Sequence, residues 1–136
     1  MRKTDSFRRQ HDEIGAVVTQ MRNHLNADEL AKDATAMFDL VVSLRGQLKV
    51  HLAMEDKTLY PRLLANDETK ATAQKFMDEM GTLGGVLADY IAKWPRAESA
   101  QTDPHGFIAD TTGLLNALVD RVERENSDLY ELADRS

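Results

Sequence analysis

The chain nearly repeats itself at an offset of about 70 residues. Residues 51–63, HLAMEDKTLYPRL, correspond to residues 121–133, RVERENSDLYELA, and the two segments share three residue pairs, Glu55/Glu125, Leu59/Leu129 and Tyr60/Tyr130. A second pair of segments repeats at nearly the same offset, residues 11–21 (HDEIGAVVTQM) and residues 80–90 (MGTLGGVLADY). The repeat predicts that the fold contains a duplicated pair of helices.

The two copies of the repeat differ at their histidines. His11 in the first copy corresponds to Met80 in the second, and His51 corresponds to Arg121. Both copies keep the glutamate. A site built from these residues would therefore have its histidine ligands on one side only.

The spacing of apolar residues predicts helices throughout the chain. They recur at intervals of three and four residues, which is typical of helices with one buried face. Asn26 with Glu29 forms a capping-box pattern, and Asp103 followed by Pro104 is a second helix start signal. Pro61 is expected to kink or end the helix that contains it. The predicted helices span residues 5–25, 27–64, 68–93 and 104–133.

Four helices joined by mostly short connections predict an all-α, up-down-up-down four-helix bundle. A length of 136 residues suits one domain, residues 1–136, with a single core. The chain has no cysteine, so a metal would be bound by histidine nitrogen and carboxylate oxygen. Metal sites of this kind lie in a bundle core, on facing helices.

Composition also limits the partners and the location. The formal net charge of -6 argues against nucleic acid and anionic membranes as partners. No segment approaches the roughly 20 apolar residues of a membrane span. We expect a cytoplasmic protein.

Four residues are the candidate metal ligands. His51 and Glu55 are four residues apart, so they share one helix face. His11 lies on the preceding helix, and Glu125 holds the position on the last helix that Glu55 holds on the second. Burying two carboxylates without a cation is costly, because one of them would have to take up a proton. The pattern predicts a divalent metal among these four side chains.

The order of these residues resembles a known family. His11, followed by His51-x-x-x-Glu55-x-x-x-Leu59-Tyr60-Pro61, is similar to the hemerythrin-like, or HHE cation-binding, family of four-helix bundles. The resemblance implies a site for two irons, with a histidine on each of the first and third helices and His-x-x-x-Glu on each of the second and fourth.

The chain departs from the family pattern at two of the histidines. Met80 and Arg121 stand at those positions, and neither is a suitable ligand for a divalent ion. We therefore expect one metal ion, held by His11, His51 and the two glutamates. Two imidazoles and two carboxylates favour zinc, with iron as the alternative. Arg121 is expected to place its charge near the second metal position, and Tyr60 and Tyr130 are expected near the site.

The expected function is that of a metal-binding regulatory or sensor protein. It would act through an unidentified protein partner in stress or redox signalling, and an exposed apolar stripe would allow a homodimer. A single saturated site offers little catalysis, so an enzyme is not the expectation. Three alternatives remain open. One is a two-iron protein that binds or senses O2, NO or peroxide, with Glu79 or another carboxylate replacing a lost histidine. The second is a mononuclear iron enzyme acting on reactive oxygen species, and the third is a metal-free interaction domain.

Overall fold

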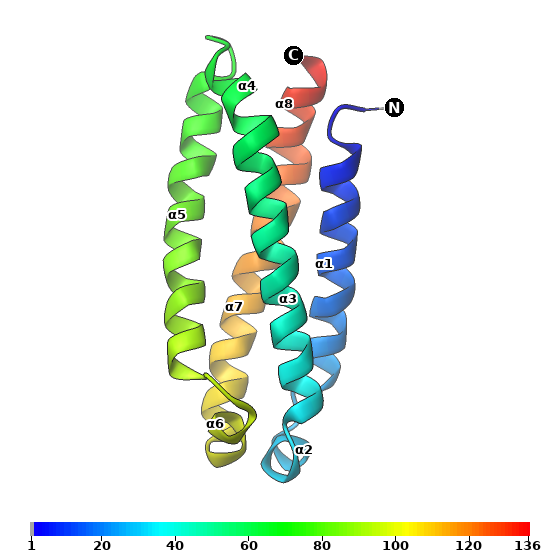
Figure 1. Ribbon diagram of the computed structural model, residues 1–136, viewed down its shortest axis with the longest axis vertical. Helices are drawn as coiled ribbons and strands as arrows, with labels where there is room; N and C mark the ends of the chain where they lie inside the picture. The colour runs from blue at the N-terminus through cyan, green and yellow to red at the C-terminus, as the bar shows by residue number, and fades with distance from the viewer. Residues whose placement is uncertain (1) are drawn as a thin grey trace.

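The computed structural model describes residues 2–136, and within that range it contains helices and no strand. The all-α prediction is confirmed. Long helices lie side by side along the long axis of the molecule, and successive ones run in opposite directions (Figure 1). Helix α1 contacts α3 and α7, and α5 contacts α7. These long helices are α1 (Asp5–Asn23), α3 (Thr35–Met54), α5 (Lys70–Lys93) and α7 (Pro104–Arg124).

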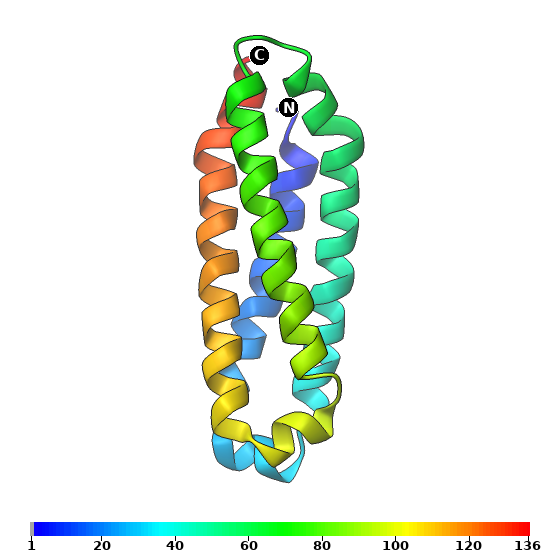
Figure 2. The same cartoon turned by 90° about the vertical axis from the view of Figure 1, so that its left-hand side faces the viewer.

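Two short helices cover the end of the molecule that lies opposite the termini (Figure 2). They are α2 (Ala27–Lys32) and α6 (Ala97–Thr102), which contact each other. The single helix predicted over residues 27–64 was therefore wrong. Asp33 adopts an extended conformation, and its Oδ1 accepts a hydrogen bond of 2.9 Å from the backbone N–H of Thr35. This local hydrogen bond competes with a continuous helix and starts α3 in a new direction.

The predicted helix start signals are present. Asn26 Oδ1 accepts a hydrogen bond of 3.0 Å from the backbone N–H of Glu29, at the start of α2. Asp103 Oδ1 accepts one of 3.1 Å from Gly106, at the start of α7. In both places the side chain satisfies a backbone donor that the first turn of a helix leaves free.

Two of the long helices are each followed by a π-helical segment that begins at a repeated glutamate. Helix α3 leads into η1 (Glu55–Leu59) and then α4 (Tyr60–Leu64), and α7 leads into η2 (Glu125–Leu129) and then α8 (Tyr130–Arg135). In each copy the tyrosine N–H donates to the carbonyl of the glutamate five residues earlier. A proline is not required for this geometry, since Glu131 stands at the position of the second copy that matches Pro61.

The π-helical segments change which residues share a face. In an α-helix, residues five apart are separated by roughly 140° around the axis, so they point in different directions. A π-turn closes the hydrogen bond between residues i and i+5 instead. The π-turn therefore brings Glu55 and Tyr60 toward the same face of the helix, and it does the same for Glu125 and Tyr130. Such single π-turns inside α-helices are frequent at functional sites.

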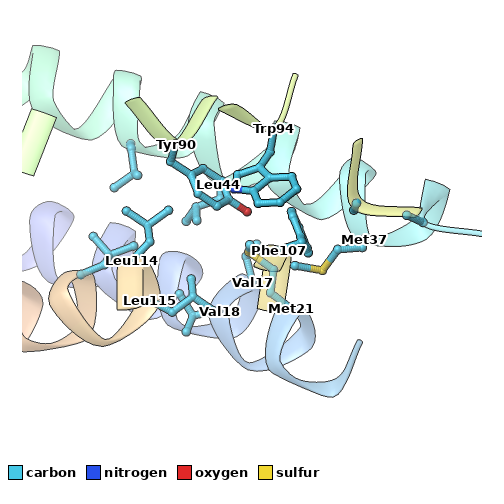
Figure 3. Close-up of a cluster of buried hydrophobic side chains, with 14 of the residues drawn as sticks. Val17, Val18, Met21, Met37, Leu44, Tyr90, Trp94, Phe107, Leu114 and Leu115 are labelled. Carbon is cyan, nitrogen blue, oxygen red and sulfur yellow. The ribbon is translucent and has the colours of Figure 1, made fainter. Parts of the chain in front are cut away.

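The apolar core has two parts. The larger part fills the half of the molecule toward α2 and α6, where Phe107 packs against Trp94 and Tyr90 (Figure 3). The smaller part lies toward the termini and includes Phe7, Tyr130 and other residues from both copies of the repeat. Along α1, Phe7 belongs to the smaller part and Ile14 to the larger part. The level of His11 therefore lies between two apolar layers.

None of the helices described over residues 2–136 combines the length and the apolar character needed to cross a membrane.

Candidate metal centre

The structure buries all four predicted ligands between these two layers. His11 comes from α1, His51 from α3, Glu55 from the start of η1 and Glu125 from the start of η2. Their exposed fractions are 3%, 3%, 0% and 2%. Ionisable groups are seldom buried this fully unless they are paired or bind a metal.

Three of these residues point donor atoms at a common position. The Nε2 atoms of His11 and His51 are 3.1 Å apart, and Glu125 Oε1 lies 2.9 Å from the first and 3.6 Å from the second. These three side chains form a group whose ligand atoms all lie within 4.8 Å of one another. Glu55 Oε2 joins from the side, at 3.4 Å from His51 Nε2.

Two amides hold the imidazole rings in place. His11 Nδ1 lies 2.9 Å from Asn126 Oδ1, and His51 Nδ1 lies 2.7 Å from Gln10 Oε1. An amide oxygen only accepts, so each Nδ1 donates its proton to the amide, and Nε2 is the nitrogen that would bind an ion once it carries no proton. Sequence reasoning missed both amides. Their only sequence signal is that each is the chain neighbour of a predicted ligand.

The arrangement fits a divalent cation on two counts. Two imidazole nitrogens 3.1 Å apart repel each other unless a proton or a metal ion lies between their lone pairs. In addition, Glu55 Oε1 is buried and has no hydrogen-bond partner among residues 2–136. A buried carboxylate oxygen is costly to leave unpaired. A metal ion would bind the lone pairs of the two imidazole nitrogens and also give Glu55 Oε1 a partner.

The pKa values describe the charges that a metal would meet. Burial lowers the pKa of His51, but hydrogen bonds to Glu125 and Glu55 outweigh it and raise this pKa to about 9. Burial acts to raise the pKa of Glu125, yet hydrogen bonds from His11 and His51 bring it down to about 2. Glu125 is therefore ionised, and a metal ion would have to compete with the proton on His51.

The two repeated tyrosines lie in different surroundings. Tyr130 Oη donates to Glu55 Oε2 at 2.6 Å and also lies 3.1 Å from His11 Nε2 and 3.3 Å from His51 Nε2. Tyr60 Oη is instead 3.5 Å from a guanidinium nitrogen of Arg121. Burial, together with the nearby negative charges of Glu125 and Glu55, raises the pKa of both phenols above the normal value.

Arg121 lies on the opposite side of Glu125 from the histidines. Its Nε donates to Glu125 Oε2 at 3.3 Å, and another guanidinium nitrogen donates to the carbonyl oxygen of Phe76 at 2.7 Å. The guanidinium also lies over the Phe76 ring, 4.8 Å from its centre. Glu125 thus has one oxygen facing the imidazoles and the other facing a buried positive charge.

The other residues named for the second metal position are not placed as ligands. Met80 is half-buried and lines an apolar cavity of about 30 Å³ between α3, α5 and α7. Glu79 pairs with two arginines, at 2.6 Å from Arg124 and 3.4 Å from Arg121. Its carboxylate is therefore engaged toward the protein surface, which weakens the two-iron alternative that relied on it.

Removing the amide that orients His51 should weaken metal binding. In Gln10→Leu the hydrogen bond to His51 Nδ1 is lost, so the ring is free to rotate and to change tautomer. We expect the affinity for the ion to fall by about 10–100-fold, the usual cost of losing such a partner. Gln20→Leu, at an exposed position of the same helix, is the control. Equal affinities of the two variants in a competition titration with a coloured chelator would contradict this role.

Comparison with known proteins gives one match. The family model described as the hemerythrin HHE cation binding domain matches residues 2–133. No curated protein and no solved structure matches the chain. The match spans nearly the whole sequence and includes every residue of the histidine and glutamate cluster, and it implies metal binding. The chain belongs to the hemerythrin HHE cation-binding family.

Proposed function

We propose that this protein binds one divalent metal ion per chain among His11, His51, Glu55 and Glu125. The observation that carries the proposal is the approach of the two Nε2 atoms and Glu125 Oε1 around one buried position. We also infer that the long helices form the antiparallel four-helix bundle of the family, with the ion at the level where both π-helical segments begin.

The side of the site that faces Arg121 supports a single ion. Arg121 stands where the repeat would place a second histidine, and its guanidinium is a permanent cation with donors only. It already binds Glu125 Oε2 and the Phe76 carbonyl. A second dication next to this charge would be repelled. Reversible oxygen binding by two irons is therefore not the function that we propose.

We infer a regulatory or sensor role, through a protein partner, from the burial of the site. The four proposed ligands are at most 3% exposed. A bound ion would stabilise the folded state, since the unfolded chain lacks the arranged ligands. Occupancy of the site would then change the stability of the helices around it, which a partner can detect. A mononuclear enzyme would instead need an open coordination position reached by its substrate.

Removal of the metal tests the binding itself. At an ion concentration 100 times Kd, bound metal should add about 2.7 kcal/mol to the free energy of unfolding. A strong chelator should therefore lower Tm, and added Zn²⁺ or Fe²⁺ should restore it. Thermal unfolding followed by circular dichroism measures both steps. The same Tm with chelator and with each of the added ions would refute the proposal of a metal site.

The regulatory part has its own test. A pull-down from cell extract should recover a partner with the metal-loaded protein and lose it with His51→Ala. Recovery of the same partner in equal amount by both proteins would show that partner binding does not depend on the metal. Size-exclusion chromatography of the loaded protein at several concentrations would show whether the partner is a second copy of the chain.

A further inference from the structure

The Tyr130 hydroxyl makes more contacts than a hydrogen bond to Glu55 requires. Its single proton is donated to Glu55 Oε2 at 2.6 Å. The same oxygen still lies 3.1 Å from His11 Nε2 and 3.3 Å from His51 Nε2. The phenol oxygen is therefore in contact with three of the four proposed ligands, at the position where their donor atoms converge.

We propose that Tyr130 Oη is a further ligand of the metal, bound as the phenolate. This inference rests on the proposed metal site and adds an oxygen ligand of a different chemical class to it. When the bond between the metal and Oη forms, the phenolic proton leaves the site to solvent. The hydrogen bond from Tyr130 to Glu55 is then lost, and both oxygens face the ion instead.

The fold holds this oxygen in place. The π-turn of η2 puts Tyr130 on the same face as Glu125, five residues earlier, which an α-helix would not do. The ring is fully buried, stacks on the His11 imidazole at 5.0 Å between ring centres and packs against Phe7 at 5.8 Å. A side chain confined in this way keeps its hydroxyl at the site.

The charge balance also favours a phenolate. The carboxylates of Glu55 and Glu125 together neutralise a dication, and Glu79 pairs with Arg124 at 2.6 Å. Glu79 also pairs with the buried guanidinium of Arg121, at 3.4 Å, so two arginines share this one carboxylate and one positive charge is left over. A phenolate on the metal would cancel it. Buried charges are stable only when they are compensated in this way.

A fifth donor changes the choice of metal. Zinc in protein sites is most often four-coordinate, whereas iron commonly accepts five or six ligands. With Tyr130 the site offers two nitrogens and three oxygens, one of them a phenolate. This set of five ligands suits iron better than the four ligands without Tyr130 do. Tyrosine is also a known protein ligand of iron in haem enzymes.

Tyr60 is the matched control that the repeat provides. It occupies the same position in the first copy and follows the same kind of π-turn. Its hydroxyl, however, lies 3.5 Å from the Arg121 guanidinium, in the half of the site that lost its histidines. Tyr60→Phe removes a phenol oxygen that we do not assign to the metal.

Ultraviolet difference spectroscopy tests the assignment with Zn²⁺ alone. Titrating Zn²⁺ into the metal-free protein should produce a tyrosinate band, with one tyrosinate for each ion bound. We expect the same band in Tyr60→Phe, no band in Tyr130→Phe, and a zinc affinity at least about tenfold lower in Tyr130→Phe. With Fe³⁺, wild type and Tyr60→Phe should also show a visible phenolate charge-transfer band that Tyr130→Phe lacks.

The outcomes separate this inference from the proposed function. Zinc binding that His51→Ala abolishes, but that gives no tyrosinate band in wild type, would overturn the ligand role of Tyr130 and leave the metal site intact. A tyrosinate band that persists in Tyr130→Phe would overturn it as well. Failure of wild type to bind either ion would overturn the metal site and the tyrosine ligand together.

Discussion

Replacing His51 with alanine should abolish metal binding at the buried site. His51 Nε2 lies within 3.6 Å of His11 Nε2, Glu125 Oε1 and Glu55 Oε2, so it contacts every other proposed ligand. Its loss removes an inner ligand, which costs more than the 10–100-fold in affinity that is typical of an outer partner. We expect the affinity to fall by more than about 100-fold.

The matched control for His51→Ala is His24→Ala. His24 is a partly exposed histidine that pairs with Glu29 at 3.0 Å, outside the cluster. This variant should bind metal as wild type does. Isothermal titration of the metal-free proteins with Zn²⁺ and with Fe²⁺, the latter without oxygen, measures both affinities. Unchanged binding in His51→Ala would place the metal elsewhere in the chain.

Replacing Arg121 with methionine should destabilise the protein strongly. The substitution keeps much of the side-chain volume but removes the charge beside Glu125 and the donor to the Phe76 carbonyl. Breaking a buried ion pair by removing one partner costs about 3–5 kcal/mol, because the other charge is left uncompensated. We expect a loss of that size in the free energy of unfolding of the metal-free protein.

Arg124→Met controls for the loss of an arginine on the same helix. Arg124 is about one-third exposed and pairs with Glu79, and an exposed pair of this kind contributes about 0–1 kcal/mol. Urea unfolding of wild type and both variants gives the comparison. If Arg121→Met were no less stable than Arg124→Met, the buried guanidinium would not be the counter-charge of Glu125.

The sequence was sufficient to predict which four side chains lie together in the core, but not which residues support them. The four-residue spacing of His51 and Glu55 and the position of Glu125 in the repeat are local patterns. On a helix such patterns determine directly which side chains share a face. Gln10 and Asn126 give no such signal. Each reaches an imidazole on another helix, and the pairing depends on how the helices are packed. Contacts of this kind follow from tertiary structure.

The repeat also concealed a difference between the two tyrosines. Tyr60 and Tyr130 occupy equivalent positions, so sequence comparison assigns them equal roles. In the structure each tyrosine contacts a residue of the other copy. Tyr130 contacts His51, and Tyr60 contacts Arg121, which corresponds to His51 in the repeat. Residue spacing predicted a helix through each of the π-turns that place the tyrosines, and the only interruption expected here was at Pro61.

The breaks in the predicted second helix have a similar origin. The apolar spacing continues across Asp33 and Glu55, and so it predicts one helix through both. A side-chain hydrogen bond to Thr35 ends the helix at the first position, and a π-turn interrupts it at the second. Neither event changes the apolar pattern, which reports the buried face of a segment rather than its continuity.

The most direct test of a single-ion site is the number of metal ions bound per chain. The protein is purified without added metal, loaded with Fe²⁺ or Zn²⁺ in separate samples, freed of excess ion by gel filtration and then measured by elemental analysis against protein concentration. We expect one ion per chain in wild type and fewer than about 0.1 in His51→Ala, because an affinity lowered more than about 100-fold does not survive gel filtration. Two ions per chain would contradict the assignment of Arg121 to the second position, and none would contradict the site itself.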